Sequence, residues 1–531
     1  MNISPEKVFA EYETARRFKA SIGRHGLYEQ NRINERFYIG DQWHGAAVGN
    51  ERPLVRHNVI KRIGDFKIAE LLRSPISVRY IAEGVAESRE IKKQIKEAKT
   101  RLARGEAAES ELTVSLMVSA LNSFRQSCAE RLGLSSVLES ALRDAYIRGT
   151  GAVYTYFDPD IKTGLFAGDT PILGDIVCET LRIEDIYFGD PAVTSLQAQP
   201  YIILAEEKRS SQLLAEAERF GANKNLLNNL KEKGEEKQLL LTKLYRARDE
   251  KGEIKVFAVR VSEKAVIRQP FCLGISLYPL SLFSWERRDS SIYADSEITH
   301  LIPNQIAINR MITAATWSSL SSGMPLMVVN GDLVGGEITN DPGQIIKVYG
   351  AAEEIDTAVN FVNPPDFSAG YNEATENLIF NTLTQSGANE AALGDLEATN
   401  TSAIIELREA SRGHLLPLKN RFYAFAADIA NIWAEFFFAH YGKRGLKVRD
   451  ENGVWYFPFD AKRYKDVVLR VNAFASEGIS KGERDKLDTL NLLLEKGAIT
   501  AAQYIKRLPA GMLDDKEELL EELKEAADER I

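Results

Sequence analysis

Hydrophobic positions near the N-terminus recur at helical spacing. Val8, Tyr12 and Ala15 form one apolar stripe, which is typical of an amphipathic helix. A second helical pattern covers residues 58–72 and ends at Ser74-Pro75, because a proline disfavours helical geometry at the residue before it. Residues 87–111 are densely charged but keep apolar residues at helical spacing, so we expect a solvated helix with one packed edge. Two further helices are expected before Gly149.

After Gly149 the pattern changes to that of strands. Residues 152–157 and 175–179 are expected to be strands that flank a glycine-rich turn. Residues 239–246 and 254–261 predict a hairpin across the turn Asp249-Glu-Lys-Gly252. Together with the preceding helices, these strands predict an α+β unit that extends to about residue 285.

Long helices dominate the region after residue 295. Residues 295–321 predict a helix of about 40 Å at 1.5 Å per residue, which Ser296 can cap and Gly323 can end. A second helix is expected over residues 368–385. Between the two helices, short β-like runs separated by Gly, Asn and Pro predict a small domain, with strands over 326–329, 345–349 and 359–362.

A loop and a third long helix follow. Residues 386–400 are rich in Gly, Ala and polar residues and predict a loop. Residues 401–441 predict a helix of about 60 Å if straight, with a kink at Pro417, whose ring would clash with the carbonyl of Gly413. Strands are then expected over 454–459 and 467–473, and the last part of the chain is expected to be helical.

Composition narrows the class of protein. At 531 residues the chain is too long for one compact core, and its 44% hydrophobic and 27% charged residues are usual for globular proteins. The net charge of −9 argues against a strongly basic nucleic-acid clamp. The sequence has neither the apolar run of a membrane span nor that of a signal peptide, so we expect a soluble protein of a reducing compartment, with no membrane partner. The three cysteines, Cys128, Cys178 and Cys272, form no CxxC motif, and we expect each to be a small buried side chain.

The charges are unevenly distributed along the chain. Residues 289–407 hold 16 Asp or Glu but only two basic residues, Arg310 and Lys347, which gives a formal charge of −14. One interpretation is that this stretch is buried or interfacial, where lysine is depleted. Burial would also remove the carboxylates, however, and they remain. A solvated acidic surface on the two helices, the small domain and the loop therefore fits the pattern better.

Known catalytic and cofactor motifs are absent from the sequence. There is no P-loop, no H-E-x-x-H, no G-x-S-x-G and no kinase signature. The six histidines are scattered, and His440 is expected to be a favourable charge at the end of the third long helix rather than a ligand. We therefore expect no catalytic residues, no metal and no cofactor. Two long helices that bracket a small domain would be poorly buried in a monomer, and a ring of copies is one symmetric way to cover them.

Several segments, in order along the chain, resemble one family. They are residues 144–151 (DAYIRGTG), 183–191 (IEDIYFGDP), 295–309 (DSEITHLIPNQIAIN) and 493–500 (LLEKGAIT), together with 58–60 and 74–76. This succession is similar to that of the portal proteins of tailed bacteriophages. No single motif is specific, but the resemblance covers nearly the whole chain.

The resemblance implies an α+β, predominantly helical portal-type fold that assembles as a ring, usually of twelve subunits, at one capsid vertex. Its parts would be a wing (1–290), a first stem helix (291–322), a clip (323–366), a second stem helix (367–385), a tunnel loop (386–400), a long kinked helix and strands of the wing (401–475) and a helical crown (476–531). Double-stranded DNA would pass through the axial channel without sequence specificity. The implied partners are other copies of the chain, the packaging motor (terminase), head–tail adaptor proteins, the major capsid protein and the scaffold. The implied location is the portal vertex of the virion, with assembly in the cytoplasm of the host bacterium.

Candidate site residues follow from this correspondence. The tunnel loop would contribute Asn389, Glu390, Asp395, Glu397 and Asn400, and the stem would line the channel with Arg310, Glu373 and Glu376. The carboxylates would repel phosphates and let the duplex slide, over a range of about 8 Å at physiological salt. Candidate clip contacts are Met324, Met327, Leu333 and Lys347, although the apolar residues among these could equally form the clip's own small core.

Two other functions remain open at this point. Another ring-forming head–tail or tail-tube component is one, but most of these are much shorter chains. A hydrolase with an unrecognised site is the other, and the lack of a nucleophile–base or metal-ligand spacing argues against it.

Overall fold

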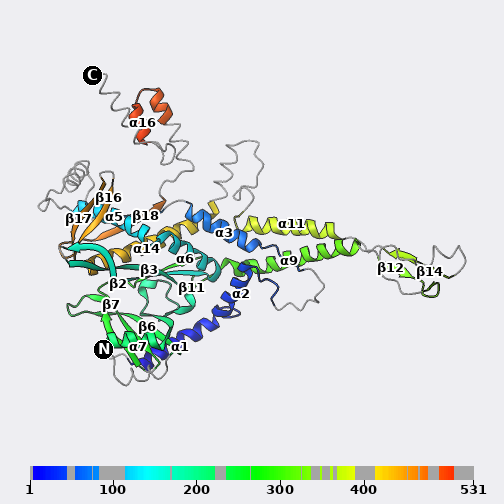
Figure 1. Ribbon diagram of the computed structural model, residues 1–531, viewed down its shortest axis with the longest axis horizontal. Coiled ribbons are helices and arrows are strands. Elements are labelled where there is room, and N and C mark those ends of the chain that lie inside the picture. Colours follow the sequence, from blue (N-terminus) through cyan, green and yellow to red (C-terminus); the bar gives the residue numbers. More distant parts are fainter. Residues whose placement is uncertain are drawn as a thin grey trace.

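The computed structural model shows a body of mixed helices and strands from which a pair of long helices projects (Figure 1). The two helices, α9 (Glu297–Ser322) and α11 (Ser368–Gln385), lead to a small tip that contains strands. We call these parts the body, the helix pair and the tip. The structure describes residues 4–44, 54–73, 76–82, 114–167, 170–221, 235–263, 265–323, 326–335, 347–349, 359–362, 367–388, 413–450, 453–464, 467–475 and 490–507.

Helices form the N-terminal part of the body. They are α1 (Pro5–Ser21), α2 (Leu27–Ile39), α3 (Val59–Leu72), α5 (Val114–Arg131) and α6 (Leu134–Arg148). Asn58 caps α3, because its side chain accepts a hydrogen bond from the backbone N–H of Lys61 (3.0 Å). The fully buried Tyr146 joins α6 to α3, since its hydroxyl donates to the carbonyl of Ile60 (2.7 Å).

A three-stranded antiparallel sheet lies against these helices. Its order is β3-β2-β9, formed by β2 (Thr150–Ala167), β3 (Thr170–Leu181) and β9 (Leu280–Ser284). Thr155 on β2 stands opposite Cys178 on β3. The indole N–H of Trp433 donates to the Cys178 sulfur (3.1 Å), so this sheet is tied to the helix α14 (Leu416–His440) that crosses it.

A second, five-stranded sheet lies between α1 and α7 (Ser210–Arg219). Its order is β4-β5-β6-β7-β8, with β4 (Ile186–Phe188), β5 (Tyr201–Arg209), β6 (Lys237–Arg248), β7 (Ile254–Ser262) and β8 (Ala265–Cys272). Leu241 packs with Val8 of α1, whereas the neighbouring Leu240 packs with Leu213 of α7. Since successive strand residues point to opposite faces, the two helices cover opposite faces of the sheet.

Segments from the two ends of the chain meet in the body. The strand β1 (Ile76–Ala82) pairs antiparallel with β18 (Leu469–Ala475), almost four hundred residues later. The hydroxyl of Tyr80 on β1 donates to the carbonyl of Ala430 in α14 (2.9 Å). The hairpin of β16 (Lys443–Asp450) and β17 (Gly453–Asp460) follows α14 and contributes Leu446 and Phe457 to the same hydrophobic core.

The remaining elements are short. The strands β10 (Glu286–Arg288) and β11 (Ser291–Asp295) form a hairpin directly before α9. In the tip, β12 (Leu326–Val329) pairs with β15 (Val359–Val362), and β13 (Val334–Gly335) pairs with β14 (Lys347–Val348). One turn each of 3-10 helix covers Ile183–Asp185, Leu196–Ala198 and Gly413–Leu415, and α16 is Ala501–Arg507.

Many sequence-based element predictions are confirmed. The helix expected at 368–385 matches α11, and the one expected at 295–321 differs from α9 by two residues at its start and one at its end. The hairpin across Asp249-Glu-Lys-Gly252 forms with Leu241 opposite Val261. The elements that were not predicted are the helix α7 and the strands β1, β4, β5, β8, β9, β10, β11, β13 and β16. The charged stretch 87–111 lies outside the described residues.

Three local predictions are wrong or need correction. Pro417 does not kink the interior of the described helix: α14 begins at Leu416, so the proline stands in its first turn, where no backbone N–H is required. Residues 401–412 lie outside the described part. Cys272 is exposed, whereas Cys128 and Cys178 are buried. His440 stacks on Phe157 at 4.6 Å, and burial lowers its pKa, so it is not a favourable helix-end charge at neutral pH.

Close packing of α3 on α6 contributes to the stability of the body. An added Cβ at Gly64 would lie 2.2 Å from Cε1 of Tyr146. We therefore expect Gly64→Ala to lower the free energy of unfolding by about 1–3 kcal/mol, since overpacking a full core forces side chains to move. Urea unfolding followed by circular dichroism measures the change.

Gly370→Ala is the matched control. Gly370 is also helical, but a Cβ there meets nothing within 4 Å. We expect this variant to unfold like the wild type or to gain up to about 1 kcal/mol from helix propensity. Equal unfolding midpoints for the two variants would contradict the proposed tight contact.

Candidate functional site

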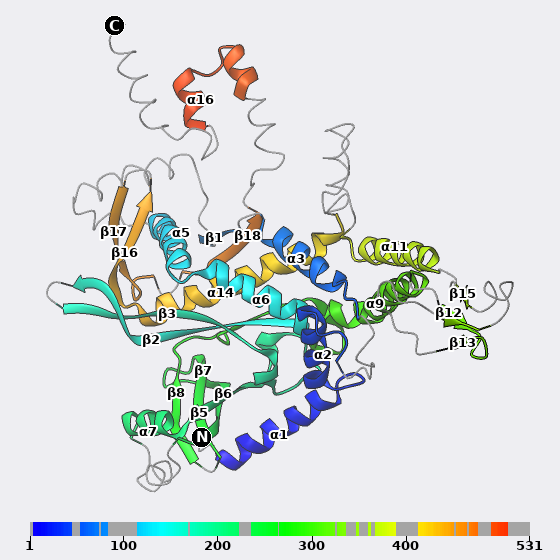
Figure 2. The ribbon, with the colours of Figure 1, turned by 45° about the vertical axis from the view of Figure 1, so that its right-hand side comes forward.

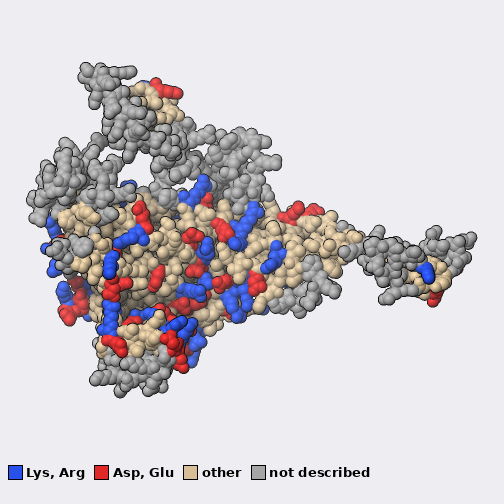
Figure 3. Space-filling model, in the orientation of Figure 1, with Lys and Arg blue, Asp and Glu red and all other residues tan. Residues whose placement is uncertain are grey.

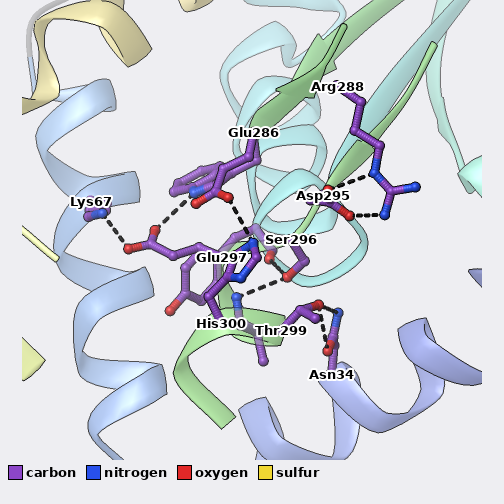
Figure 4. Close-up of polar contacts among 12 residues, drawn as sticks. Asn34, Lys67, Glu286, Arg288, Asp295, Ser296, Glu297, Thr299 and His300 are labelled. Carbon is purple, nitrogen blue, oxygen red and sulfur yellow. Dashed lines mark hydrogen bonds and ion pairs between the residues drawn. The ribbon is translucent and has the colours of Figure 1, made fainter. Parts of the chain in front are cut away.

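The first turn of α9 fixes the helix pair to the body. Ser296 caps this helix: its hydroxyl oxygen accepts a hydrogen bond from the N–H of Ile298 (3.1 Å) and donates to the carbonyl of Tyr146 at the end of α6 (2.5 Å). One side chain thus caps α9 and binds α6. We call this region, shown in Figure 4, the root of the helix pair.

A buried ion pair lies at the centre of the root. Glu297 accepts hydrogen bonds from Nζ of Lys67 on α3 (2.6 Å) and from the indole N–H of Trp285 (2.9 Å). The side chains of Lys67 and Glu297 are only 10% and 9% exposed. Removing one partner from such a pair leaves an uncompensated buried charge, so the two residues depend on each other.

Further polar pairs surround this centre. Arg288 binds Asp295 across the β10–β11 hairpin, and His300 lies 3.2 Å from a carboxylate oxygen of Glu286. Burial raises the pKa of Glu286, and the nearby His300 opposes that increase. Figure 4 shows that these residues come from the strands before α9 and from its first turn. The root therefore connects the hairpin and the helix through charged groups as well as through the backbone.

Asn34 adds a contact from α2. Its amide nitrogen donates to the carbonyl of Ile147 (3.0 Å) and to the hydroxyl of Thr299 (3.1 Å). Asn34 is almost fully buried. The root thus joins α2, α3 and α6 to the start of α9.

Two amide side chains extend the attachment along α9. The side-chain oxygen of Gln305 accepts from the N–H of Val59 (2.9 Å), and its nitrogen donates to the carbonyl of His57 (2.7 Å). Asn309 accepts from the N–H of His57 (3.1 Å) and donates to Gln42 (2.6 Å). These bonds satisfy backbone groups at the start of α3, where helices have unpaired N–H groups.

The two projecting helices run antiparallel. Near the body, the amide of Asn304 on α9 donates to the hydroxyl of Thr382 on α11 (3.1 Å). Near the tip, the N–H of Phe367 donates to the hydroxyl of Ser318 (2.9 Å). The buried residues of α11 form a narrow stripe, Thr375, Thr382 and Leu383. Most of its remaining surface is therefore not covered by α9.

That uncovered surface carries several large apolar side chains among polar, mostly uncharged ones. Trp317 and Leu320 on α9 are 42% and 45% exposed, and Tyr371 and Phe380 on α11 are 40% and 50% exposed. Figure 3 shows a helix pair with few charges beside a body with many charges of both signs. Large exposed apolar patches on soluble proteins mark interaction sites. The helix pair is the clearest such surface among the described residues.

The structure places the sequence-predicted residues on separate elements. Arg310 is exposed on α9, and Glu373 and Glu376 are exposed on α11. Whether they line a channel stays a prediction. The tunnel-loop residues Asn389, Glu390, Asp395, Glu397 and Asn400 lie outside the described residues, as does Met324.

The other candidate contact residues gather at the tip. Met327 on β12 stands opposite Phe361 and is 38% exposed, and Lys347 is exposed on β14. Leu333 is half-buried, and its carbonyl accepts from the N–H of Tyr349 (2.7 Å). The structure brings these three residues together in the tip.

Sequence reasoning missed the centre of the root. Lys67, Trp285 and Glu297 belong to different segments, and 230 positions separate Lys67 from Glu297. It also missed the exposed aromatic residues of the helix pair. A local signal existed for those on α11, Tyr371 and Phe380: no Lys or Arg occurs between residues 348 and 407, although aromatic residues do.

The described ranges contain neither a membrane-spanning helix nor a cluster of metal-ligand side chains. No helix there is both long enough and apolar enough to cross a bilayer. No three His, Cys, Asp or Glu side chains of that part come together as metal ligands would.

Comparison with known proteins gives similarities among solved structures. No protein-family model and no curated protein match the sequence. Among solved structures, a chain from the "neck of empty GTA particle computed with C6 symmetry" is similar, with 11% identity and a TM-score of 0.32. The match covers 91% of this chain and 98% of the other. A similarity of this size does not establish a common fold, so functional inference rests on the chain's own residues.

The buried pair of the root gives a testable prediction. We expect Glu297→Gln to lower the free energy of unfolding by about 3–5 kcal/mol, because Lys67 would remain buried without a counter-charge. The double variant Lys67→Met/Glu297→Gln should be more stable than Glu297→Gln alone. Urea unfolding of the single and double variants measures the coupling.

The exposed pair Arg143–Glu139 is the control. A guanidinium nitrogen of Arg143 lies 2.8 Å from a carboxylate oxygen of Glu139, but both side chains are about half exposed. Glu139→Gln should cost less than about 1 kcal/mol. A cost for Glu297→Gln that is no larger would show that the root pair does not hold α9.

Proposed function

We propose that the chain is the subunit of a portal ring, a structural protein without catalytic activity. The ring would occupy one vertex of a phage-type capsid, and double-stranded DNA would enter and leave through its central channel. The observation that carries this proposal is the exposed apolar surface of the helix pair, which neighbouring copies in a ring would cover.

The root supports repeated assembly. A closed ring requires each copy to present the same surface at the same angle to the next. Because α9 is fixed to α2, α3 and α6 by buried polar contacts, the helix pair has a defined direction relative to the body. This attachment suits a contact that repeats from one subunit to the next.

The charges of the helix pair suit a DNA channel. Arg310, Glu373 and Glu376 are its exposed charged side chains, apart from the histidine near the root. A basic channel would hold DNA through release of counterions, whereas a mostly neutral and acidic wall lets it move. The acidic tunnel loop at residues 386–400 is proposed to continue this wall.

The tip is proposed as the contact site for other particle proteins. Met327 and Lys347 are exposed there, at the end farthest from the body. The packaging motor (terminase) and the head–tail adaptors would bind this end in turn. The body would contact the major capsid protein and the scaffold, which places the assembled ring in the virion.

Assembly can be tested on the apolar surface. We expect Leu320→Glu and Phe380→Glu to prevent formation of the large oligomer, because each places a charge in the proposed contact between copies. Sedimentation velocity measures assembly, and circular dichroism verifies that each variant is folded. Ile254→Glu is the control: Ile254 is 56% exposed on a strand of the body, and its replacement should leave assembly unchanged. Normal assembly of both helix-pair variants would contradict the proposed interface.

DNA retention tests the charge of the channel. The wild-type ring should bind short duplex DNA weakly at about 0.15 M salt, whereas Glu373→Lys/Glu376→Lys should bind it more tightly and with a steeper salt dependence. Fluorescence anisotropy of labelled DNA measures both. Glu13→Lys/Glu29→Lys adds the same charge on the exposed faces of α1 and α2 and serves as the control. Equal DNA binding by the two double variants would contradict a channel position for α11.

A further inference from the structure

A large cleft lies between the three-stranded sheet and the five-stranded sheet of the body. It has a volume of about 1240 Å³ and is lined by the ribbon of β2 and β3, by the strands β5 to β8, by α7 and by the end of α14. Figure 2 shows the β2–β3 ribbon extending over β7 and β8. An ion pair between Arg219 of α7 and Asp160 of β2 (2.7 Å) joins the two walls. The cleft lies on the body, apart from the root and the helix pair.

One border of the cleft is an unpaired strand edge. The strand β9 pairs with β2 only from Thr150 to Tyr154, and the N–H of Thr155 then donates to the carbonyl of Pro279 (3.0 Å). Beyond Thr155, β2 has no strand neighbour on this side within the described residues. Such an edge can accept an added extended segment through backbone hydrogen bonds.

Arg268 on β8 supplies an unpaired positive charge. Its guanidinium lies over the rings of Phe271 (3.3 Å) and Phe220 (3.9 Å). Within the part of the chain that the structure describes, it makes no ion pair or hydrogen bond. The neighbouring Arg260, by contrast, is paired with Glu216 (2.6 Å). Burial and the proximity of Arg260 lower the pKa of Arg268, so an anion bound there would relieve an unfavourable charge.

Glu179 on β3 supplies an unpaired negative charge on the opposite wall. No described residue donates a hydrogen bond to its carboxylate or forms an ion pair with it. Burial and the proximity of Glu206 raise its pKa. Tyr154 stands opposite Glu179 in the sheet, and its ring stacks with that of Tyr156, the two ring centroids being 5.5 Å apart. Aromatic faces next to a carboxylate suit a cationic side chain.

We propose that this cleft binds an extended segment of another polypeptide that carries one acidic and one basic side chain. The volume exceeds the range of about 300–1,000 Å³ typical of small-molecule pockets. Side chains two positions apart in an added strand point to the same face of the sheet, and Tyr154 and Glu179 stand on the face of the β2–β3 sheet that borders the cleft. A segment along the edge of β2 can therefore direct two side chains into the cleft from positions i and i+2, a carboxylate toward Arg268 and a cationic group toward Glu179.

Cys272 makes occupancy of the cleft measurable. It lines the cleft and is exposed, whereas Cys128 and Cys178 are buried. The probe is the capped hexapeptide Thr-Val-Glu-Val-Lys-Thr, and the readout is the rate at which Cys272 reacts with a thiol reagent. We expect the peptide to slow this reaction in a saturable manner. A peptide with Gln in place of both Glu and Lys should bind at least about tenfold more weakly, the usual effect of losing charge-assisted hydrogen bonds.

Variants of the chain test whether Arg268 and Glu179 contact the charged side chains of the peptide. Arg268→Gln should weaken binding of the charged peptide about tenfold, and it should not weaken binding of a peptide that lacks only the Glu. Glu179→Gln should likewise weaken binding of the charged peptide, and it should not weaken binding of a peptide that lacks only the Lys. Arg32→Gln, which removes an exposed arginine of α2, is the control and should leave binding unchanged.

Three results would overturn the proposal. One is the absence of any protection by the charged peptide. Another is equal affinity of Arg268→Gln and the wild type for that peptide. The third is equal protection by inorganic phosphate alone, which would make the cleft a site for a small anion. None of these results depends on ring assembly, so they are distinguishable from a failure of the proposed function.

Discussion

The buried carboxylate of Glu297 is the constraint on which the arrangement of this molecule depends. It lies in the first turn of α9, and it binds Lys67 of α3 and Trp285 of the preceding strand segment. Three parts of the chain must therefore meet before this charge is satisfied. Because the charge cannot remain buried and unpaired without a large cost, the start of α9 has one stable position on the body. The direction of the whole projecting pair follows from that position.

The body and the helix pair differ in how far they bury their apolar side chains. In the body, segments from both ends of the chain, such as β1 and β18, close a common core. Beyond its attachment to the body, the helix pair packs within the described residues mainly through the contact of α9 with α11, and this narrow contact leaves Trp317 and Phe380 exposed. A rigidly attached element with an uncovered apolar surface is suited to contact with further copies. This combination, and not any catalytic group, is the basis of the proposed ring.

Local features of the sequence were sufficient to predict the helix pair. Ser296 and Gly323 mark the ends of α9 because capping depends on residues within one turn of the terminus. Pro417 was misinterpreted, since a proline is accepted both at a kink and in the first turn of a helix, and only the structure distinguishes the two. The root could not be predicted because its partners are far apart in the sequence and carry no motif. The unpaired charges of Arg268 and Glu179 could not be predicted from the sequence either, since pairing depends on residues of neighbouring strands.

Electron cryo-microscopy of the purified full chain tests the central claim most directly. We predict a closed ring in which α9 and α11 of every copy surround a central channel, with Trp317 and Phe380 covered by the neighbouring copies. A ring with the helix pair pointing away from the axis would contradict the channel assignment. A monomer or dimer with these aromatic residues exposed, in the presence of the scaffold as well as without it, would contradict the ring itself.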